Sequence, residues 1–261
     1  MKIGISGGTG LEKLIATTLK DYPLLITASK YDLKKEKFEN IPNVEFFPEF
    51  LNHNYIEEFG RNCDIYIDVS PSNKIKYLVS DFAQYFNKIS YILFYNDGWK
   101  FLKLSKNSHL SYYKEFSVSK PFISLPEIDR EFLLSILEKE NFANDENWIY
   151  DLSKKEKKVL ELSKKKEHNF DFMKGQYADI ASVSCSDNSV AISQMNSVNI
   201  SLDFYKENLK KFMQLSKENP FFLEFKYERF KILIFKQGRF IIKGTKEKNT
   251  AFYIFYHFFG F

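Results

Sequence analysis

The sequence contains little cysteine and no long apolar run. Two cysteines, Cys63 and Cys185, stand among 261 residues, too few for a disulfide framework or a cysteine-based zinc cluster. The four histidines are spread along the chain without the spacing of a ligand set, so no metal site is expected. No apolar stretch approaches the length of a membrane-spanning helix, and the chain opens on a strand-like segment without a signal segment. These absences favour a reducing, cytoplasmic location and no membrane partner.

The sequence also lacks a large excess of charge of either sign. The chain carries 38 basic and 34 acidic side chains, a formal net charge of +4, which is too balanced to make nucleic acid the expected partner. We therefore expect a small-molecule substrate. The densest basic stretch, residues 154–158 with 164–166, is interrupted by acids and is typical of a solvated helix face. The core should be rich in aromatic residues, because the chain holds 28 Phe and 16 Tyr.

The first part of the chain alternates short apolar runs with amphipathic segments, which is the pattern of parallel strands linked by crossover helices. The pattern predicts strands at 2–6, 24–29, 44–47, 64–69 and 90–95. It predicts helices at 10–21, 31–38, 53–61 and 73–87, followed by helices at 127–140 and 152–167. This predicts a Rossmann-like, cofactor-binding domain over residues 1–125.

The second half of the chain shows shorter, strand-rich segments. Strands are predicted at 180–185 and 190–194 around a turn, and at 221–227, 230–235 and 239–243. A helix is predicted at 203–216 and an aromatic helix at 250–258. We therefore expect an α/β protein in which a Rossmann-like parallel sheet is followed by a smaller mixed α+β half. Residues 126–261 would form a substrate or oligomerisation domain. The aromatic tail needs cover, which favours a homo-oligomeric interface.

A glycine loop follows the first strand and opens the first helix. The predicted cofactor-binding residues of this loop are Ser6, Gly7, Gly8, Thr9, Gly10 and Leu11. Glycines let the backbone approach a ligand, and free amides at a helix start favour an anion or a polar cofactor group. The alternative is a tight structural turn.

The ends of three other strands meet the same edge of a parallel sheet. Ser29 and Lys30 stand at the end of the second strand, where a base suits the phosphate of NADP, although such a lysine is more often an ordinary surface residue. The remaining predicted cofactor-binding residues are Ser70, Pro71, Asn73, Tyr95 and Asn96. Asp68 is the candidate catalytic residue, which would position a water or the cofactor. As alternatives, Asp68 and Ser70 cap the next helix, and residues 95–98 form a plain turn.

Two stretches resemble known families. The opening, residues 2–10, looks like the start of NADP-dependent dehydrogenases, including deazaflavin-linked NADP oxidoreductases of archaea. The segment 237–245, with Ala251 and Tyr256, is similar to the end of the ubiquitin-activating and sulfur-carrier adenylyltransferases. The front half lacks the paired CxxC motifs of that family, which makes adenylation a minor alternative.

In overall layout the chain resembles the pyridinol C-methyltransferases (HcgC type) of iron-guanylylpyridinol (FeGP) cofactor biosynthesis in methanogenic archaea. The resemblance implies S-adenosylmethionine as cofactor and methylation of a ring carbon of a hydroxypyridine. Such a reaction displaces the sulfonium methyl in line, after a base or an ordered water deprotonates a ring hydroxyl. An NADP-dependent oxidoreductase is the main alternative, because the same glycine loop serves both functions. A non-catalytic adenosine-ligand-binding or assembly protein is the third possibility, favoured by the absence of any recognisable catalytic triad or metal set in the sequence.

Overall fold

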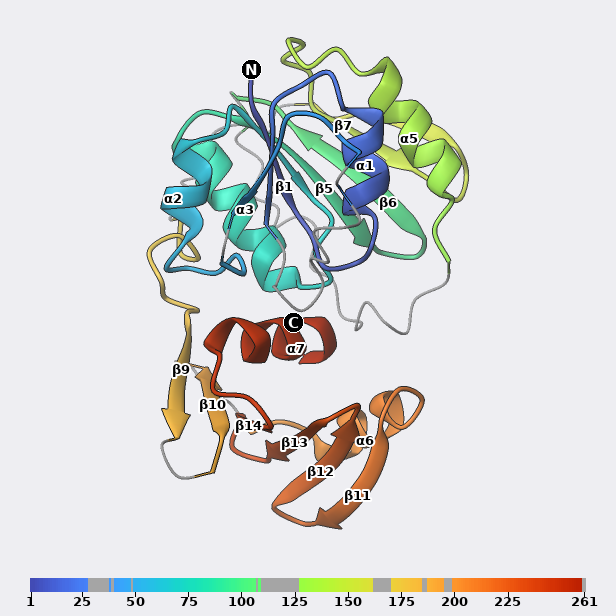
Figure 1. Cartoon of the computed structure of the whole chain (residues 1–261). Helices are drawn as coiled ribbons and strands as arrows, with labels where there is room; N and C mark the ends of the chain where they lie inside the picture. The colour runs from blue at the N-terminus through green and yellow to red at the C-terminus, as the bar shows by residue number, and fades with distance from the viewer. Residues whose placement is uncertain are drawn as a thin grey trace.

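A computed structural model of the chain describes residues 1–27, 38, 40–47, 49–106, 108, 127–161, 170–184, 187–194 and 199–259. Its elements form two sheets, with a helix between them (Figure 1). The protein is an α/β protein whose front sheet is mostly parallel and whose rear sheet is antiparallel, as the sequence predicts. Ser29, Lys30, Cys185 and most of the helix predicted at 31–38 lie outside the described residues.

The front sheet has eight strands in the order β3-β2-β1-β4-β5-β6-β7-β8. The strands are β1 (Ile3–Ser6), β2 (Leu24–Thr27), β3 (Val44–Phe47), β4 (Ile65–Asp68), β5 (Ile89–Tyr95), β6 (Trp99–Leu104), β7 (Trp148–Asp151) and β8 (Glu156–Val159). The first five in this order are parallel, and the last three pair antiparallel. Because β1 is flanked by β2 and β4, the strand order reverses beside it, which is where ligands bind in open α/β sheets.

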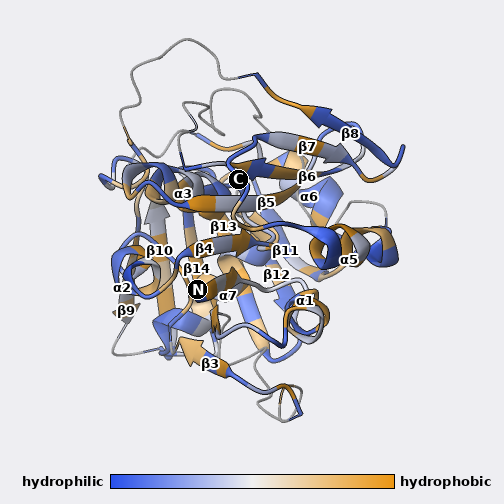
Figure 2. Ribbon diagram, turned by 90° about the horizontal axis from the view of Figure 1, so that it is seen from above, coloured by the Kyte–Doolittle hydropathy of each residue, from blue (hydrophilic) through white to orange (hydrophobic). Residues whose placement is uncertain are grey.

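Four helices cover the front sheet, two on each face. Helices α1 (Glu12–Thr18) and α5 (Arg130–Lys139) pack on one face, and α2 (Ile56–Arg61) and α3 (Asn73–Tyr85) pack on the other (Figure 2). The central strands β1, β2 and β4 are buried along their whole length, because helices cover both faces.

The rear sheet has six antiparallel strands in the order β11-β12-β13-β14-β10-β9. The strands are β9 (Asp179–Ser184), β10 (Ser189–Gln194), β11 (Gln214–Asn219), β12 (Phe222–Tyr227), β13 (Phe230–Phe235) and β14 (Arg239–Lys243). Helices α6 (Leu202–Leu209) and α7 (Lys248–Phe259) complete this half. Strands β12 to β14 alternate buried and more exposed residues, so this sheet buries only one face.

Helix α7 is the aromatic tail, and it lies between the two sheets (Figure 1). Nine of its residues are buried within the chain itself: Thr250, Ala251, Phe252, Tyr253, Ile254, Phe255, Tyr256, Phe258 and Phe259. All of these except Thr250 join one apolar cluster with residues of α2, α3 and the rear sheet. The chain thus supplies the cover that we expected partly from a second subunit, and the homo-oligomer stays a prediction that this helix does not require.

Two helices predicted from the sequence are wrong in whole or in part. The segment predicted as a helix at 152–167 begins with a turn and strand β8, which is exposed throughout and pairs with β7. Judged by local propensity, its lysines and glutamates favour a helix, but charged residues of this kind also suit an exposed sheet edge. The helix predicted at 203–216 ends at Leu209, and strand β11 begins at Gln214.

The front sheet also continues past the predicted boundary at residue 125, because β7 pairs with β6 and β8 pairs with β7. Antiparallel pairing of short strands across a long connection leaves no periodic signal in the sequence, which explains why it was not anticipated. Within the part of the chain that is described, no helix combines the length and apolar character needed to cross a membrane.

Candidate functional site at the carboxyl edge of the parallel sheet

The loops after β1, β4 and β5 meet at one edge of the front sheet, because these strands are parallel and adjacent. The pairing register places Ser6 beside Asp68, the last residues of β1 and β4. The structure therefore brings together the two stretches that the sequence singles out, residues 6–11 and 68–73.

The glycine loop turns sharply after β1. The amide of Gly7 donates to the carbonyl of Thr27, 3.0 Å away, which continues the pairing with β2. Gly8 has φ +125° and Gly10 has φ +81°, conformations that favour glycine. A side chain at Gly8 would also lie 3.3 Å from the ring of Pro71 and 3.7 Å from the ring of Tyr253. The loop conformation expected from the glycines is therefore present.

The amides of this loop are already bonded to a carboxylate of the chain. Glu12, the first residue of α1, accepts hydrogen bonds from the amide of Gly8 and from that of Thr9, the latter at 3.0 Å. Its side chain is 5% exposed and lies so close to Gly7 that a Cβ there would collide with it. Glu12 thus occupies the position that an anionic ligand group takes at such a loop.

Helix α7 covers the loop from the other side. The ring of Tyr253 faces Gly8, and the imidazole of His257 donates a hydrogen bond to the backbone of Gly8. The two rings lie 5.4 Å apart. Burial lowers the pKa of His257 to about 4, against the smaller opposing effect of the bond to Gly8. The Nδ1 atom of His257 is buried without a hydrogen-bond partner.

Asp68 belongs to a buried cluster of polar groups. One carboxylate oxygen accepts from the hydroxyl of Ser6, and the other accepts from Nζ of Lys76 at 2.9 Å. The Lys76 ammonium also donates to the carbonyl of Ser70. Asp68 and Lys76 are 0% and 1% exposed. Burial lowers the pKa of Lys76, and the charge of Asp68 opposes that shift. The carboxylate is therefore held by the fold itself.

The segment that follows β4 leads directly into the N-terminus of α3. Ser72 caps this helix by accepting a hydrogen bond from the amide of Ile75 at 3.4 Å, so the capping residue is neither Asp68 nor Ser70. Asn73, the first residue of the helix, is 5% exposed.

Tyr95 ends β5, and Asn96 begins the tight turn that leads into β6. The amide of Asn96 donates to the carbonyl of Gly98 at 3.0 Å, and Asp97 has φ +50°. The Tyr95 ring packs edge-on against Trp99, with centroids 5.6 Å apart. This geometry matches the plain-turn alternative for residues 95–98.

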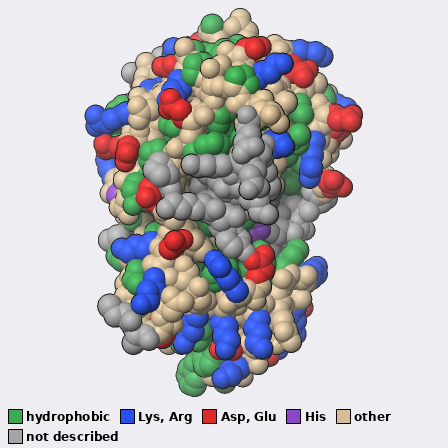
Figure 3. All heavy atoms as spheres, in the orientation of Figure 1, with side chains coloured by type: hydrophobic (Ala, Val, Ile, Leu, Met, Phe, Trp, Pro, Cys, Tyr) green, Lys and Arg blue, Asp and Glu red, His purple; other side chains and the backbone are tan. Residues whose placement is uncertain are grey.

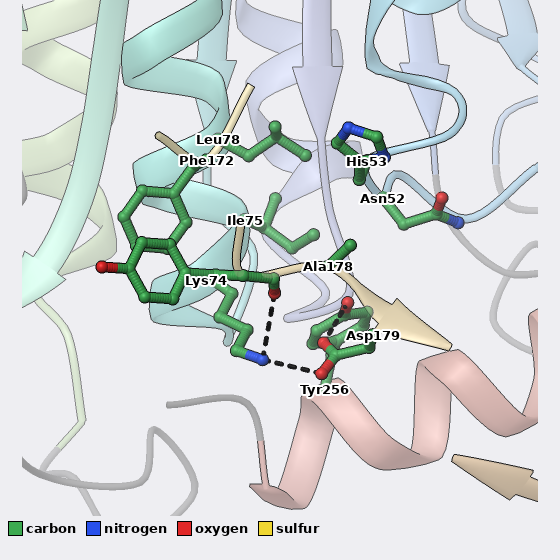
Figure 4. A pocket seen from close by; sticks show the side chains of 10 residues that line it. Asn52, His53, Lys74, Ile75, Leu78, Phe172, Ala178, Asp179 and Tyr256 are labelled. Carbon is green, nitrogen blue, oxygen red and sulfur yellow. Dashed lines mark hydrogen bonds and ion pairs between the residues drawn. The ribbon is translucent and has the colours of Figure 1, made fainter. Parts of the chain in front are cut away.

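A second polar cluster ties the two halves together below this edge (Figure 4). Lys74 donates to Asp179 of β9 at 2.7 Å, and Tyr256 of α7 donates to the other oxygen of Asp179 at 2.7 Å. The side chain of Asp179 is 0% exposed. Burial and the Asp179 charge raise the pKa of Tyr256. A pocket of about 20 Å³ beside the cluster has room for roughly one water molecule.

Sequence reasoning missed Glu12, Lys76, Tyr253 and His257, which are the residues that close this edge. The signal for Glu12 was an acid two residues after Gly10, and Lys76 lies one helical turn after Asn73. The approach of α7 left no local signal. Across the described ranges, no three His, Cys, Asp or Glu side chains gather as a group able to hold a metal ion.

No protein-family model and no curated protein matches the sequence. Among solved structures, the crystal structure of E. coli MccB with MccA-N7isoASN aligns with a TM-score of 0.44 and 11% identity. MccB with ATP aligns with a TM-score of 0.40 and 12% identity. Each alignment covers 65% of this chain and 66% of the MccB chain, so the chain spans just under two thirds of the length of these proteins. At this level of similarity, function has to be argued from the chain's own residues.

Proposed function

We propose that this chain is a non-catalytic binding or assembly protein, in which the Rossmann-like half serves as a scaffold and its glycine loop is closed. One observation carries the proposal. Glu12 accepts the hydrogen bonds of the loop amides on one side of the loop, while Tyr253 and His257 of α7 cover Gly8 on the other side.

Electrostatics opposes a phosphate at this loop. A phosphate bound to the amides of Gly8 and Thr9 would have to displace the Glu12 carboxylate or lie beside it. Two unit charges of one sign 4 Å apart repel by about 4 kcal/mol at an effective dielectric constant of 20. The loop also departs from the G-x-G-x-x-G pattern, because exposed Lys13 stands where the third glycine would allow close packing of helix and strand. Both features disfavour NADP and ATP.

Opening the loop from the other side requires moving α7. That helix buries seven large apolar or aromatic residues between the sheets, and each contributes about 1.5–3 kcal/mol by its burial. The Lys74–Asp179–Tyr256 cluster adds polar contacts that hold the same helix against α3 and β9. The closed loop is therefore part of the core of the protein.

A second candidate is the S-adenosylmethionine-dependent C-methyltransferase acting on a hydroxypyridine ring, and one observation favours it over the NADP-dependent oxidoreductase. The buried carboxylate of Glu12 suits a ligand with ammonium and sulfonium charges better than a pyrophosphate. In this function α7 would move away from Gly8, and Asp68 would position a water or the cofactor from the cluster that holds it.

Parallel calorimetric titrations with S-adenosylhomocysteine, NADPH and ATP separate these proposals. The scaffold proposal expects no binding of any of the three to the unmodified protein. The methyltransferase proposal expects S-adenosylhomocysteine to bind, and Gly8→Val, in a variant that still folds, to abolish binding. Binding of NADPH that Glu12→Ala strengthens would favour the oxidoreductase. Micromolar binding of any of these ligands would overturn the scaffold proposal.

A further inference from the structure

The two faces of the rear sheet differ in character. Strands β12, β13 and β14 point one set of side chains into the core against α7. Phe225, Ile232 and Ile242 belong to this set and are fully buried. The alternate residues form the open face of the sheet, which we define as Phe222, Glu224, Lys226, Lys231, Leu233, Phe235, Arg239, Ile241 and Lys243. Figure 3 shows basic side chains gathered over this sheet at the lower end of the molecule.

Three lysines form a row across this open face. Lys226 of β12 lies opposite Lys231 of β13, and Lys231 lies opposite Lys243 of β14. Neighbouring strands are about 4.8 Å apart, so three positive charges follow one another at close spacing. Nζ of Lys243 forms an ion pair with the carboxylate of Asp187 at 3.4 Å. In the described part of the chain, neither Lys226 nor Lys231 has an acidic partner within 4.0 Å.

This row is costly for the sheet, since like charges directly opposite each other destabilise paired strands. The surrounding chain does not neutralise it, because residues 199–259 contain twelve basic and six acidic side chains. Glu224, the acid on the open face, accepts a hydrogen bond from Ser216 at 2.7 Å. A local arrangement that costs stability, and that an acidic contact offsets at Lys243 but not at Lys226 or Lys231 among the described residues, is typical of a binding surface.

Apolar side chains run alongside the lysine row. Leu233 lies opposite Ile241 in the next row of the sheet, and both are half-buried. One row further, Phe222 lies opposite Phe235, with ring centroids 5.7 Å apart. An occupant of this face therefore meets the lysine row along one side, and aliphatic and aromatic groups together with exposed Arg239 along the other.

We propose that the open face binds an acidic, amphipathic segment of a protein partner. Its carboxylates lie along Lys226, Lys231 and Lys243, and its apolar side chains cover Leu233 and Ile241. Nucleic acid fits less well, because bases stack on exposed ring faces, whereas the two phenylalanine rings are half-buried and tilted by 42° toward each other. The proposal names a partner for the binding role proposed above and rests on that role, but it concerns a surface separate from the glycine loop.

The test uses the full chain and a fluorescent synthetic peptide with glutamates on one helical side and leucines on the other. Fluorescence anisotropy at low salt should show binding that weakens as salt is added. Lys226→Glu with Lys231→Glu should weaken it about tenfold or more. The matched control, Lys210→Glu with Lys211→Glu at the exposed end of α6, has the same net charge and should change it by less than about threefold.

Further variants and probes make the outcome decisive. If the double glutamate variant does not fold, Lys226→Gln with Lys231→Gln should weaken binding in the same direction. Leu233→Thr, which keeps strand propensity, should weaken it several-fold. The proposal is overturned if the peptide does not bind at low salt, if both double variants weaken it equally, or if a single-stranded oligothymidine binds more tightly than the peptide. None of these outcomes depends on the glycine-loop titrations, so the two proposals fail separately.

Discussion

His257 allows a quantitative test of the contact between α7 and the glycine loop. Burial lowers the pKa of His257 to about 4 in the folded protein, whereas an unfolded histidine has a pKa near 6.5. Between these values the unfolded chain binds the proton more tightly, so the folded state loses stability as the pH falls. The contribution is fully present above about pH 6.5, and linkage predicts a loss of about 2 kcal/mol between pH 7 and pH 5.

The perturbation is His257→Gln, which keeps a donor for the Gly8 backbone and removes the titrating group. Urea unfolding followed by the fluorescence of buried Trp99 and Trp148 should be measured for both proteins at pH 7 and pH 5. The variant should lose about 2 kcal/mol less than the parent over this range. His53→Gln, on a half-exposed side chain, is the matched histidine substitution for comparison. Equal pH dependence in parent and His257→Gln would refute the buried contact.

Three further predictions concern the free energy of unfolding. Lys76→Met should lower it by about 3–5 kcal/mol because it leaves Asp68 buried and unpaired, and adding Asp68→Leu should restore most of the loss in urea unfolding. Gly7→Ala should lower it by about 3 kcal/mol through collision with Glu12, and Glu12→Ala in the same chain should recover part of that loss. Lys231→Thr should raise it by about 0.5 kcal/mol by relieving the lysine row, measured by thermal unfolding; an unchanged or lower stability would contradict the repulsion.

The parallel half of the fold could be predicted from the sequence because its signals are local. Apolar runs such as residues 24–27 and 65–68 correspond to strands buried on both faces, and their spacing leaves room for crossover helices. The glycines at 7, 8 and 10 marked the turn after β1 correctly. In the rear half, strongly alternating segments such as 222–227 and 230–235 likewise predicted their strands.

The state of the candidate site was decided by tertiary structure. Whether the loop amides meet a ligand or a carboxylate depends on the rotamer of Glu12, which the fold buries beside Gly7. Strand β7 forms by pairing with β6 across a long connection, and β8 then pairs with β7, so charged residues of high helix propensity become an edge strand. Residues 248–259 specify an aromatic helix, but contacts more than 200 residues away in sequence place its Tyr253 and His257 on Gly8. Composition and periodicity report what each segment prefers locally, whereas the closing of this loop depends on which distant surface buries the aromatic side chains.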